Sequence, residues 1–173
     1  MSNNVSRKLY KWICLFILMF LTIVLETTLF SNFRFLGATP KFIPFIVAVV
    51  ALLEGAEEGA IAGLVGGFLC DALYSGYEGF YTVVLPILAV LICLMNTVMY
   101  WKNYGMSILD WAVLVIFSHL VRYCLYMLAI GRGSIASLLY IIPGELVATF
   151  PLTPFLYITI SKIIKFFEVY EEN

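Results

Sequence analysis

Apolar and polar positions alternate along this chain in long blocks. Six long apolar stretches are separated by short polar segments, which hold most of the charged residues. Blocks of this length predict membrane helices, because a helix needs about 20 apolar residues to cross the hydrocarbon core. The sequence therefore predicts an all-α, polytopic membrane protein with six transmembrane helices. The predicted spans lie near 11–31, 40–54, 57–75, 79–101, 106–130 and 134–165.

The second and third spans differ from the other four. The second is short for a bilayer crossing, and the third is rich in glycine and weakly hydrophobic at its start. Together they predict a tight hairpin that turns at 54–58. Pro44 is expected either to bend the second span or to mark its true start, because proline is tolerated in the first turn of a helix.

Prolines also mark the last span. Pro151 and Pro154 predict a break there, because proline removes a backbone donor and interrupts the helical ladder. At the start of the fifth span, Ser107 and Asp110 have the spacing of a capping box, in which a serine and an acid satisfy free N–H groups.

Glycines recur at every fourth position from the 54–58 turn through the third span. Gly55, Gly59, Gly63 and Gly67 form an i, i+4 series that ends on Asp71. Such a series predicts one ridge along the helix, where a neighbouring helix can approach until the backbones touch. An acid at the end of an apolar segment is costly unless it is paired, which makes Asp71 a candidate functional residue.

Composition agrees with the membrane class. The chain has 173 residues, of which 63% are hydrophobic and 12% are charged. A soluble domain of this length cannot bury so much apolar surface. We therefore expect a single integral membrane domain over 1–173, with a cytoplasmic N-terminus at 1–10 and an acidic cytoplasmic tail at 166–173. The net charge of −1 and the lack of a basic run argue against nucleic acid as a partner.

The four cysteines all lie inside apolar stretches without CxxC spacing, so they are expected to behave as small hydrophobic residues. No disulfide, metal site or cofactor is predicted. The basic N-terminus and the apolar run after it resemble a signal peptide. However, the run continues from Trp12 to Phe30 without a cleavage site, which favours a retained first helix.

The distribution of lysine and arginine predicts the orientation in the plasma membrane. With the N-terminus inside, the inner side holds six basic residues and the outer side holds three, namely Arg34, Lys41 and Arg132. Basic residues favour the cytoplasmic side, so both termini and the 54–58 turn are expected in the cytoplasm.

Five ionisable residues lie inside the predicted spans: Glu26, Asp71, His119, Arg122 and Glu145. At about 1.5 Å per residue, the three acids and the arginine fall within roughly 5–8 Å of one another in depth. His119 shares a helix face with Arg122. This pattern predicts a buried polar cluster in which Arg122 is the counter-charge of Asp71.

Three interpretations of this cluster stay open. It could be structural, with charges that reach the outer interface and pair there; it could bind a ligand or a partner; or it could belong to a proton or ion path. The single histidine is more typical of a hydrogen-bonded core residue than of a metal ligand. Catalysis has no support, because the chain lacks HExxH, P-loop and GxSxG motifs.

Several motifs together resemble a known family. The stretch from Leu53 to Asp71 resembles the GxxxGxxxGxxxD signature of the rod-shape-determining MreD proteins. Three further features agree: the first span ends Glu26-Thr-Thr-Leu-Phe30, Gly37-Ala-Thr-Pro40 precedes the second span, and the last span carries Ile142-Pro-Gly-Glu145. Lys41 departs from the family, which usually has an acid or amide after the proline.

The resemblance implies a non-enzymatic scaffold in the bacterial plasma membrane. Such a protein acts with the single-span MreC, the MreB filament and cell-wall synthases in sidewall peptidoglycan synthesis. The glycines, Glu26, Asp71 and Glu145 carry over as motif positions without an established chemical role.

The same six-helix pattern and chain length are similar to the substrate-binding subunits of energy-coupling-factor vitamin transporters. Those subunits typically present an AxxxA face on the first helix. The first span here, from Ile13 to Thr28, contains no alanine. The transporter subunit is therefore the alternative, and the shape-determining scaffold is the favoured interpretation.

Overall fold

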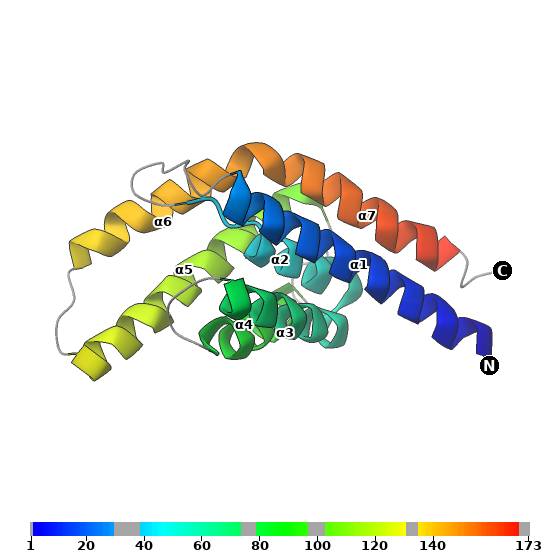
Figure 1. Cartoon of the computed structure of the whole chain (residues 1–173), viewed down its shortest axis with the longest axis horizontal. Coiled ribbons are helices and arrows are strands. Elements are labelled where there is room, and N and C mark those ends of the chain that lie inside the picture. Colours follow the sequence, from blue (N-terminus) through cyan, green and yellow to red (C-terminus); the bar gives the residue numbers. More distant parts are fainter. Residues whose placement is uncertain (1, 30–38, 74–78, 97–102, 131–134, 170–173) are drawn as a thin grey trace.

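The computed structural model describes residues 2–29, 39–73, 79–96, 103–130 and 135–169 (Figure 1). All regular structure in these residues is helical, which confirms the all-α prediction. In chain order the elements are α1 (Ser2–Thr28), α2 (Ile43–Glu54), α3 (Ala56–Leu73), α4 (Phe80–Asn96), α5 (Tyr104–Ile130), α6 (Ile135–Thr149), the 3-10 turn η1 (Phe150–Leu152) and α7 (Thr153–Val169).

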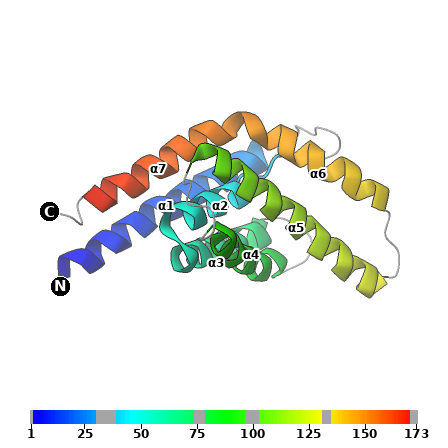
Figure 2. The ribbon, with the colours of Figure 1, turned by 180° about the vertical axis from the view of Figure 1, so that it is seen from behind.

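The long helices form an arch around a bundle of α2, α3 and α4 (Figures 1 and 2). α1 and α7 pack side by side in one arm of the arch, and the start of α1 lies near the end of α7. α5 and α6 form the other arm. The path α6–η1–α7 runs over the top and joins the two arms.

Three segments are long and apolar enough to cross a membrane: Lys8–Thr28, Tyr104–Leu125 and Ile141–Phe167. The apolar helices Ile43–Glu54 and Phe80–Asn96 are shorter. With 12 residues, α2 is about 18 Å long, whereas the hydrocarbon core is about 30 Å thick. The expectation of six spans is thus supported for three segments, and α2 is too short to cross by itself.

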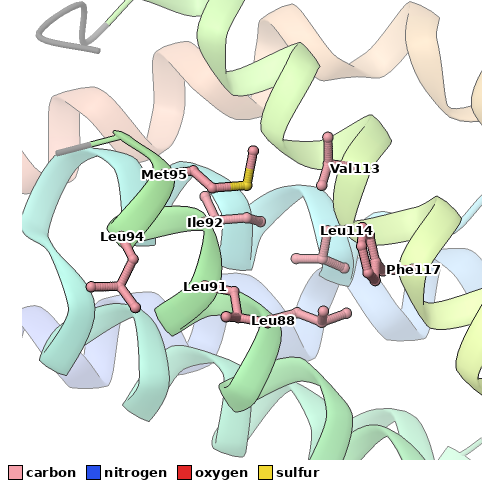
Figure 3. Close-up of a pocket in the computed structure, with 8 residues that line it drawn as sticks. All are labelled: Leu88, Leu91, Ile92, Leu94, Met95, Val113, Leu114 and Phe117. Atoms are coloured by element: carbon pink, nitrogen blue, oxygen red, sulfur yellow. The ribbon is translucent and has the colours of Figure 1, made fainter. Parts of the chain in front are cut away.

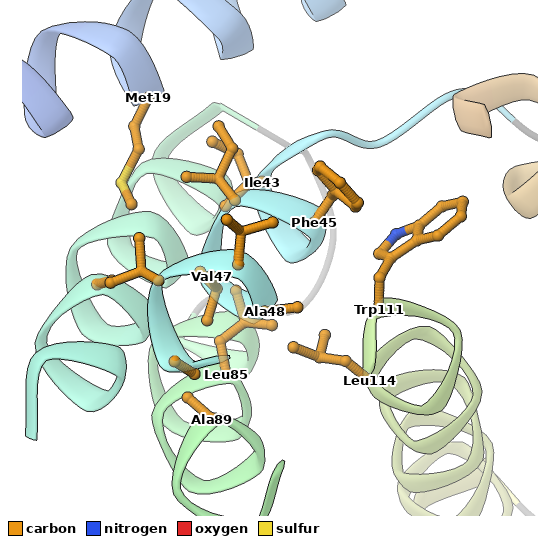
Figure 4. Packing of buried hydrophobic residues seen from close by; sticks show 14 of the residues in the cluster. Met19, Ile43, Phe45, Val47, Ala48, Leu85, Ala89, Trp111 and Leu114 are labelled. Carbon is orange, nitrogen blue, oxygen red and sulfur yellow. The ribbon is translucent and has the colours of Figure 1, made fainter. Parts of the chain in front are cut away.

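Instead, α2 forms the centre of the protein. Its residues 43–52 are all buried, and it packs against α1, α3, α4, α5 and α7. A helix that is apolar on every side is expected in such a position. Figure 4 shows Met19, Leu85 and Trp111 approaching it from three different helices. The rings of Phe45 and Trp111 meet edge to face with centroids 5.8 Å apart.

The predicted hairpin between the second and third spans is confirmed. α2 ends at Glu54, Gly55 has a φ of 106°, and α3 begins at Ala56. Glycine suits this position because it adopts a positive φ without a steric penalty. Pro44 lies in the first turn of α2, so it marks the true start of that helix.

The predicted break in the last span is also confirmed. Pro151 lies in η1, and α7 begins at Thr153, immediately before Pro154. By contrast, the capping box predicted at Ser107 is wrong. α5 begins at Tyr104, so Ser107 lies inside the helix, and Asp110 accepts a hydrogen bond from Asn96 Nδ2 at 2.7 Å.

Candidate functional site: a polar cluster at the start of α2

Lys41 is the centre of a polar cluster just before α2. Its Nζ donates a hydrogen bond to the Tyr81 hydroxyl at 2.7 Å and lies 3.8 Å from Oε2 of Glu145. The Lys41 side chain is 15% exposed and that of Glu145 is 4% exposed. Lys41 is therefore an interior cation, although its position at the start of the predicted second span assigned it to the outer side.

Glu145 connects α6 to this lysine and to α5. Its Oε2 lies 2.9 Å from His119 Nε2, so His119 takes the hydrogen-bonded core role expected of a single membrane histidine. Thr149, one turn after Glu145, donates to the Glu145 carbonyl at 2.7 Å. The same hydroxyl accepts the backbone N–H of Lys41 at 3.1 Å, so α6 holds both the side chain and the backbone of Lys41.

Glu26 enters the cluster from α1. It is 4% exposed, and its Oε2 accepts the backbone N–H of Phe42 at 3.2 Å. A carboxylate at this place faces the positive end of the α2 dipole, which stabilises the start of the helix. Glu26 also interacts electrostatically with Lys41 and Glu145. Its Oε1 is buried without a hydrogen-bond partner among the described residues.

Arg122 lies on α5, less than one turn after His119. It interacts electrostatically with both Lys41 and Glu145. The structure thus brings four of the five candidate residues around Lys41, namely Glu26, His119, Arg122 and Glu145. They come from α1, α5 and α6, so the cluster joins parts of the chain that are far apart in sequence.

Asp71 has a different role. Its two carboxylate oxygens accept the backbone N–H groups of Tyr81 at 3.0 Å and Thr82 at 2.8 Å, and Oδ2 also accepts the Thr82 hydroxyl at 2.6 Å. The prediction that Arg122 is its counter-charge is therefore wrong. Asp71 caps the first turn of α4, where free N–H groups and the helix dipole attract an acid.

The glycines of α3 explain how Asp71 reaches α4. A Cβ at Gly63 would lie 2.8 Å from the Pro86 Cα, and a Cβ at Gly67 would overlap the backbone of Tyr81 and Thr82. Side chains at these two positions would therefore push the helices apart. Their absence lets the α3 and α4 backbones touch, as in small-xxx-small interfaces of membrane proteins.

The other glycines of the series do not face α4. A Cβ at Gly59 would lie 2.7 Å from the Ala51 Cα on α2, and Gly55 lies in the turn before α3. Gly66, which is outside the i, i+4 series, faces Ile43 of α2. The glycines of α3 therefore do not form the expected single ridge. They form two faces, one that contacts α2 and one that contacts α4.

A second polar contact ties the opposite end of α2 to α1. Lys11 Nζ donates to Glu54 Oε2 at 2.6 Å, and both side chains are largely buried. Residues 11 and 26 are 15 positions apart on α1, which corresponds to about 22 Å. α1 therefore contacts both ends of α2: Glu26 binds the start of α2, and Lys11 binds Glu54 at its end.

Sequence reasoning missed three members of the cluster: Lys41, Tyr81 and Thr149. One available signal was the place of Lys41 directly before an unusually apolar segment, where a cation has little access to water. Tyr81 and Thr149 had no such signal, because tyrosine and threonine occur in many membrane helices without a polar partner.

The chemistry of the cluster is that of ion pairs and hydrogen bonds between helices. Among the described residues, no group of three or more His, Cys, Asp or Glu side chains is placed to hold a metal ion. Removing one member of a buried pair leaves an uncompensated charge, which costs far more than the pair itself contributes. The ion pairs and hydrogen bonds of the cluster therefore favour one arrangement of α1, α2, α5 and α6 relative to one another.

A comparison with models of protein families shows to which family the chain belongs. The model of rod shape-determining protein MreD matches residues 6–166, which covers nearly the whole chain. The chain belongs to the MreD family. Neither curated proteins nor solved structures give a match.

Membership in the MreD family, together with the three candidate membrane-spanning helices, identifies a membrane protein of the cell-shape machinery. The positions on which the resemblance to MreD was based fall at two places in the structure. Gly63, Gly67 and Asp71 lie at the α3–α4 contact. Glu26 and Glu145 both interact with Lys41 just before α2.

Proposed function

We propose that this chain is a non-enzymatic membrane scaffold that organises sidewall peptidoglycan synthesis during cell elongation. The observation that carries the proposal is the MreD family match over residues 6–166. In this role the protein associates with an MreC-like single-span protein, an MreB filament and cell-wall synthases. The bilayer is its further partner.

The contacts of the polar cluster support a scaffold. The charged groups of Lys41 and Glu145 bind Tyr81, His119 and each other, and so connect α4, α5 and α6. Groups that are engaged in this way hold helices in place. A surface built on fixed helices gives partner proteins a constant geometry.

Copurification from native membranes tests the proposal. The tagged protein is expected to recover MreC-like and cell-wall proteins after mild solubilisation. A tagged Gly63→Leu variant serves as control, because disruption of the α3–α4 contact is expected to abolish this recovery. Recovery of an ATPase module in place of the cell-wall proteins would contradict the scaffold and support a transporter subunit.

We further propose that the whole chain forms one membrane domain with both termini in the cytoplasm. The described part of the structure supports this, because the start of α1 and the end of α7 lie near each other (Figure 1). Single cysteines introduced at Ser2, Glu57 and Gly133 in a cysteine-free background test it. An impermeant thiol reagent should label Gly133→Cys on intact cells; labelling of Ser2→Cys instead would contradict the orientation.

A further inference from the structure

Two buried polar atoms lie about one turn apart near the start of α5. Their residues, Ser107 and Trp111, are 0% and 1% exposed. Among the described residues, neither Ser107 Oγ nor Trp111 Nε1 has a hydrogen-bond partner. Both residues lie in the candidate span Tyr104–Leu125, where the bilayer supplies no water to a polar group. Buried polar atoms without a protein partner commonly bind an ordered water molecule.

The Ser107 hydroxyl differs from most other hydroxyls on these helices. Inside a helix, serine and threonine can donate to the carbonyl four residues earlier. Six described residues do so: Thr22, Thr27, Thr28, Ser118, Thr149 and Thr159. For Ser107 that carbonyl belongs to Asn103, which accepts the backbone N–H at 3.1 Å but not the hydroxyl. The hydroxyl is therefore available to another partner.

Trp111 brings a complementary group to the same side of α5. Residues four positions apart lie on one helix face, with Cβ atoms about 5–6 Å apart. A large helical side chain extends over the turn that precedes it, so the Trp111 indole lies over the turn of Ser107. The indole N–H can only donate, whereas the hydroxyl can both donate and accept. Because the two atoms do not bind each other, a molecule between them must accept from the indole and also bind the hydroxyl.

We propose that one buried water molecule bridges Trp111 Nε1 and Ser107 Oγ. Water can both accept and donate, and it is small enough for a place where both side chains are almost fully enclosed. Its two hydrogen bonds, of about 2.8–3.0 Å each, can join atoms that lie up to about 6 Å apart. The groove between α4 and α5 offers no such site, because all the side chains that line it are apolar (Figure 3).

The water continues a row of polar contacts along this face of α5. Three residues before Ser107, the Tyr104 hydroxyl lies 2.9 Å from Thr153 Oγ1. Thr153 donates its own proton to the Phe150 carbonyl at 2.7 Å, so Tyr104 is the donor in the pair. These contacts attach the start of α5 to the proline break at η1. The site is independent of the proposed scaffold function, because it uses none of the polar cluster around Lys41.

Nuclear magnetic resonance of the whole chain in detergent micelles, with isotope-labelled indole groups, tests the proposal. Loss of a signal in Trp111→Phe identifies the Trp111 indole proton. In the wild type, a nuclear Overhauser cross-peak should connect this proton to water, with the sign of a long-lived bound molecule. Absence of that cross-peak would overturn the proposal. A cross-peak only to the ring protons of Phe45, which packs edge to face on Trp111, would overturn it as well.

A pair of serine variants tests the second partner of the water. Ser107→Ala removes that partner, so the cross-peak between the Trp111 indole proton and water should lose most of its intensity. Ser118→Ala is the matched control, because the Ser118 hydroxyl is also buried on α5 but donates to the Leu114 carbonyl at 2.7 Å. The control should keep the wild-type intensity. Equal intensity in both variants would overturn the bridge, and the wild-type spectrum tests the bound water even if a variant does not fold.

Discussion

The α2–α4 bundle and the α5–α6 arm are held by different physical means. In the bundle, glycines on α3 bring backbones into contact, and the residues of α2 from Ile43 to Leu52 are buried among apolar side chains. In the arm, α5 packs on α2 through apolar residues such as Trp111, but α6 packs mainly on α5. Besides Leu146, which packs against the apolar core, the described links of α6 to the centre of the protein are polar contacts of Glu145 and Thr149. Close packing is distributed over many atoms, whereas α6 depends on a few groups.

This difference has a consequence for how each region fails. A packed interface has no single residue whose loss opens it, but a side chain inserted between two touching backbones separates them. A polar link is insensitive to small changes in volume, but it is lost when one partner is removed. Substitutions of the two kinds should therefore give distinguishable patterns of damage.

The largest effect is expected from Gly63→Leu. The leucine would be driven into the backbone of α4 at Pro86, and we expect a loss of more than about 3 kcal/mol, the upper end of what overpacking usually costs. Thermal unfolding in detergent and accumulation in membranes measure it. Leu64→Ala, at a neighbouring position that is 53% exposed, is the control and should change stability by less than about 0.5 kcal/mol. Equal behaviour of the two variants would remove the role of the glycine face.

The next effect is expected from Lys41→Met. It leaves Glu145 without its lysine, and removal of one partner of a buried pair costs about 3–5 kcal/mol. Hydrogen exchange should increase in α6 while α3 stays protected, because Lys41 pairs with Glu145 of α6, whereas α3 is held by the contacts of its glycines with α2 and α4. The double variant with Glu145→Gln should lose less than the sum of the two single losses. Strictly additive losses would mean that the pair does not contribute.

A smaller difference is expected between two adjacent glycines. Gly67→Ala places a methyl group against the backbone of Tyr81 and Thr82, which cannot move independently of α4, so we expect a loss of about 1–3 kcal/mol. Gly66→Ala meets the Ile43 Cγ2, the end of a side chain, at 2.8 Å and should cost less. Detergent unfolding of the two variants compares them directly. The reverse order would contradict the assignment of the two faces.

The smallest effect is expected from the cap of α4. Asp71→Ala removes the acceptor of the first N–H groups of that helix, and loss of an N-cap costs about 0.5–2 kcal/mol. Because Arg122 belongs to the other cluster, a cycle of Asp71→Asn and Arg122→Gln should be additive within about 0.5 kcal/mol. A larger coupling energy would show that the two residues interact after all.

Much of the fold could be predicted from the sequence because the signals are local. The apolar blocks indicated the helices, the glycine at 55 indicated a turn, and the prolines at 151 and 154 indicated the break in the last helix. Each of these depends on the conformational preference of a residue or on the length of a segment. The shortness of α2 was visible as well, but its position at the centre of the protein was not.

The site could be predicted only in part, because depth along a helix does not determine direction around it. Similar depth grouped Glu26, Arg122 and Glu145, and in the structure all three interact electrostatically with Lys41 just before α2. The same criterion wrongly added Asp71, whose side chain points from α3 to α4. Which helices become neighbours depends on how the whole protein packs. No short segment of a single sequence specifies it.

The length and position of α2 also bear on how the protein enters the membrane. A helix of 12 residues is too short to remain across a bilayer alone, and the glycines of α3 make that helix a weak independent span. We therefore expect that neither inserts on its own, and that the two helices and the turn at Gly55 enter as one hairpin beside α1, whose Lys11 pairs with Glu54. On this expectation, insertion and folding are a single event for this part of the chain, and the α3 glycines are requirements for membrane integration itself.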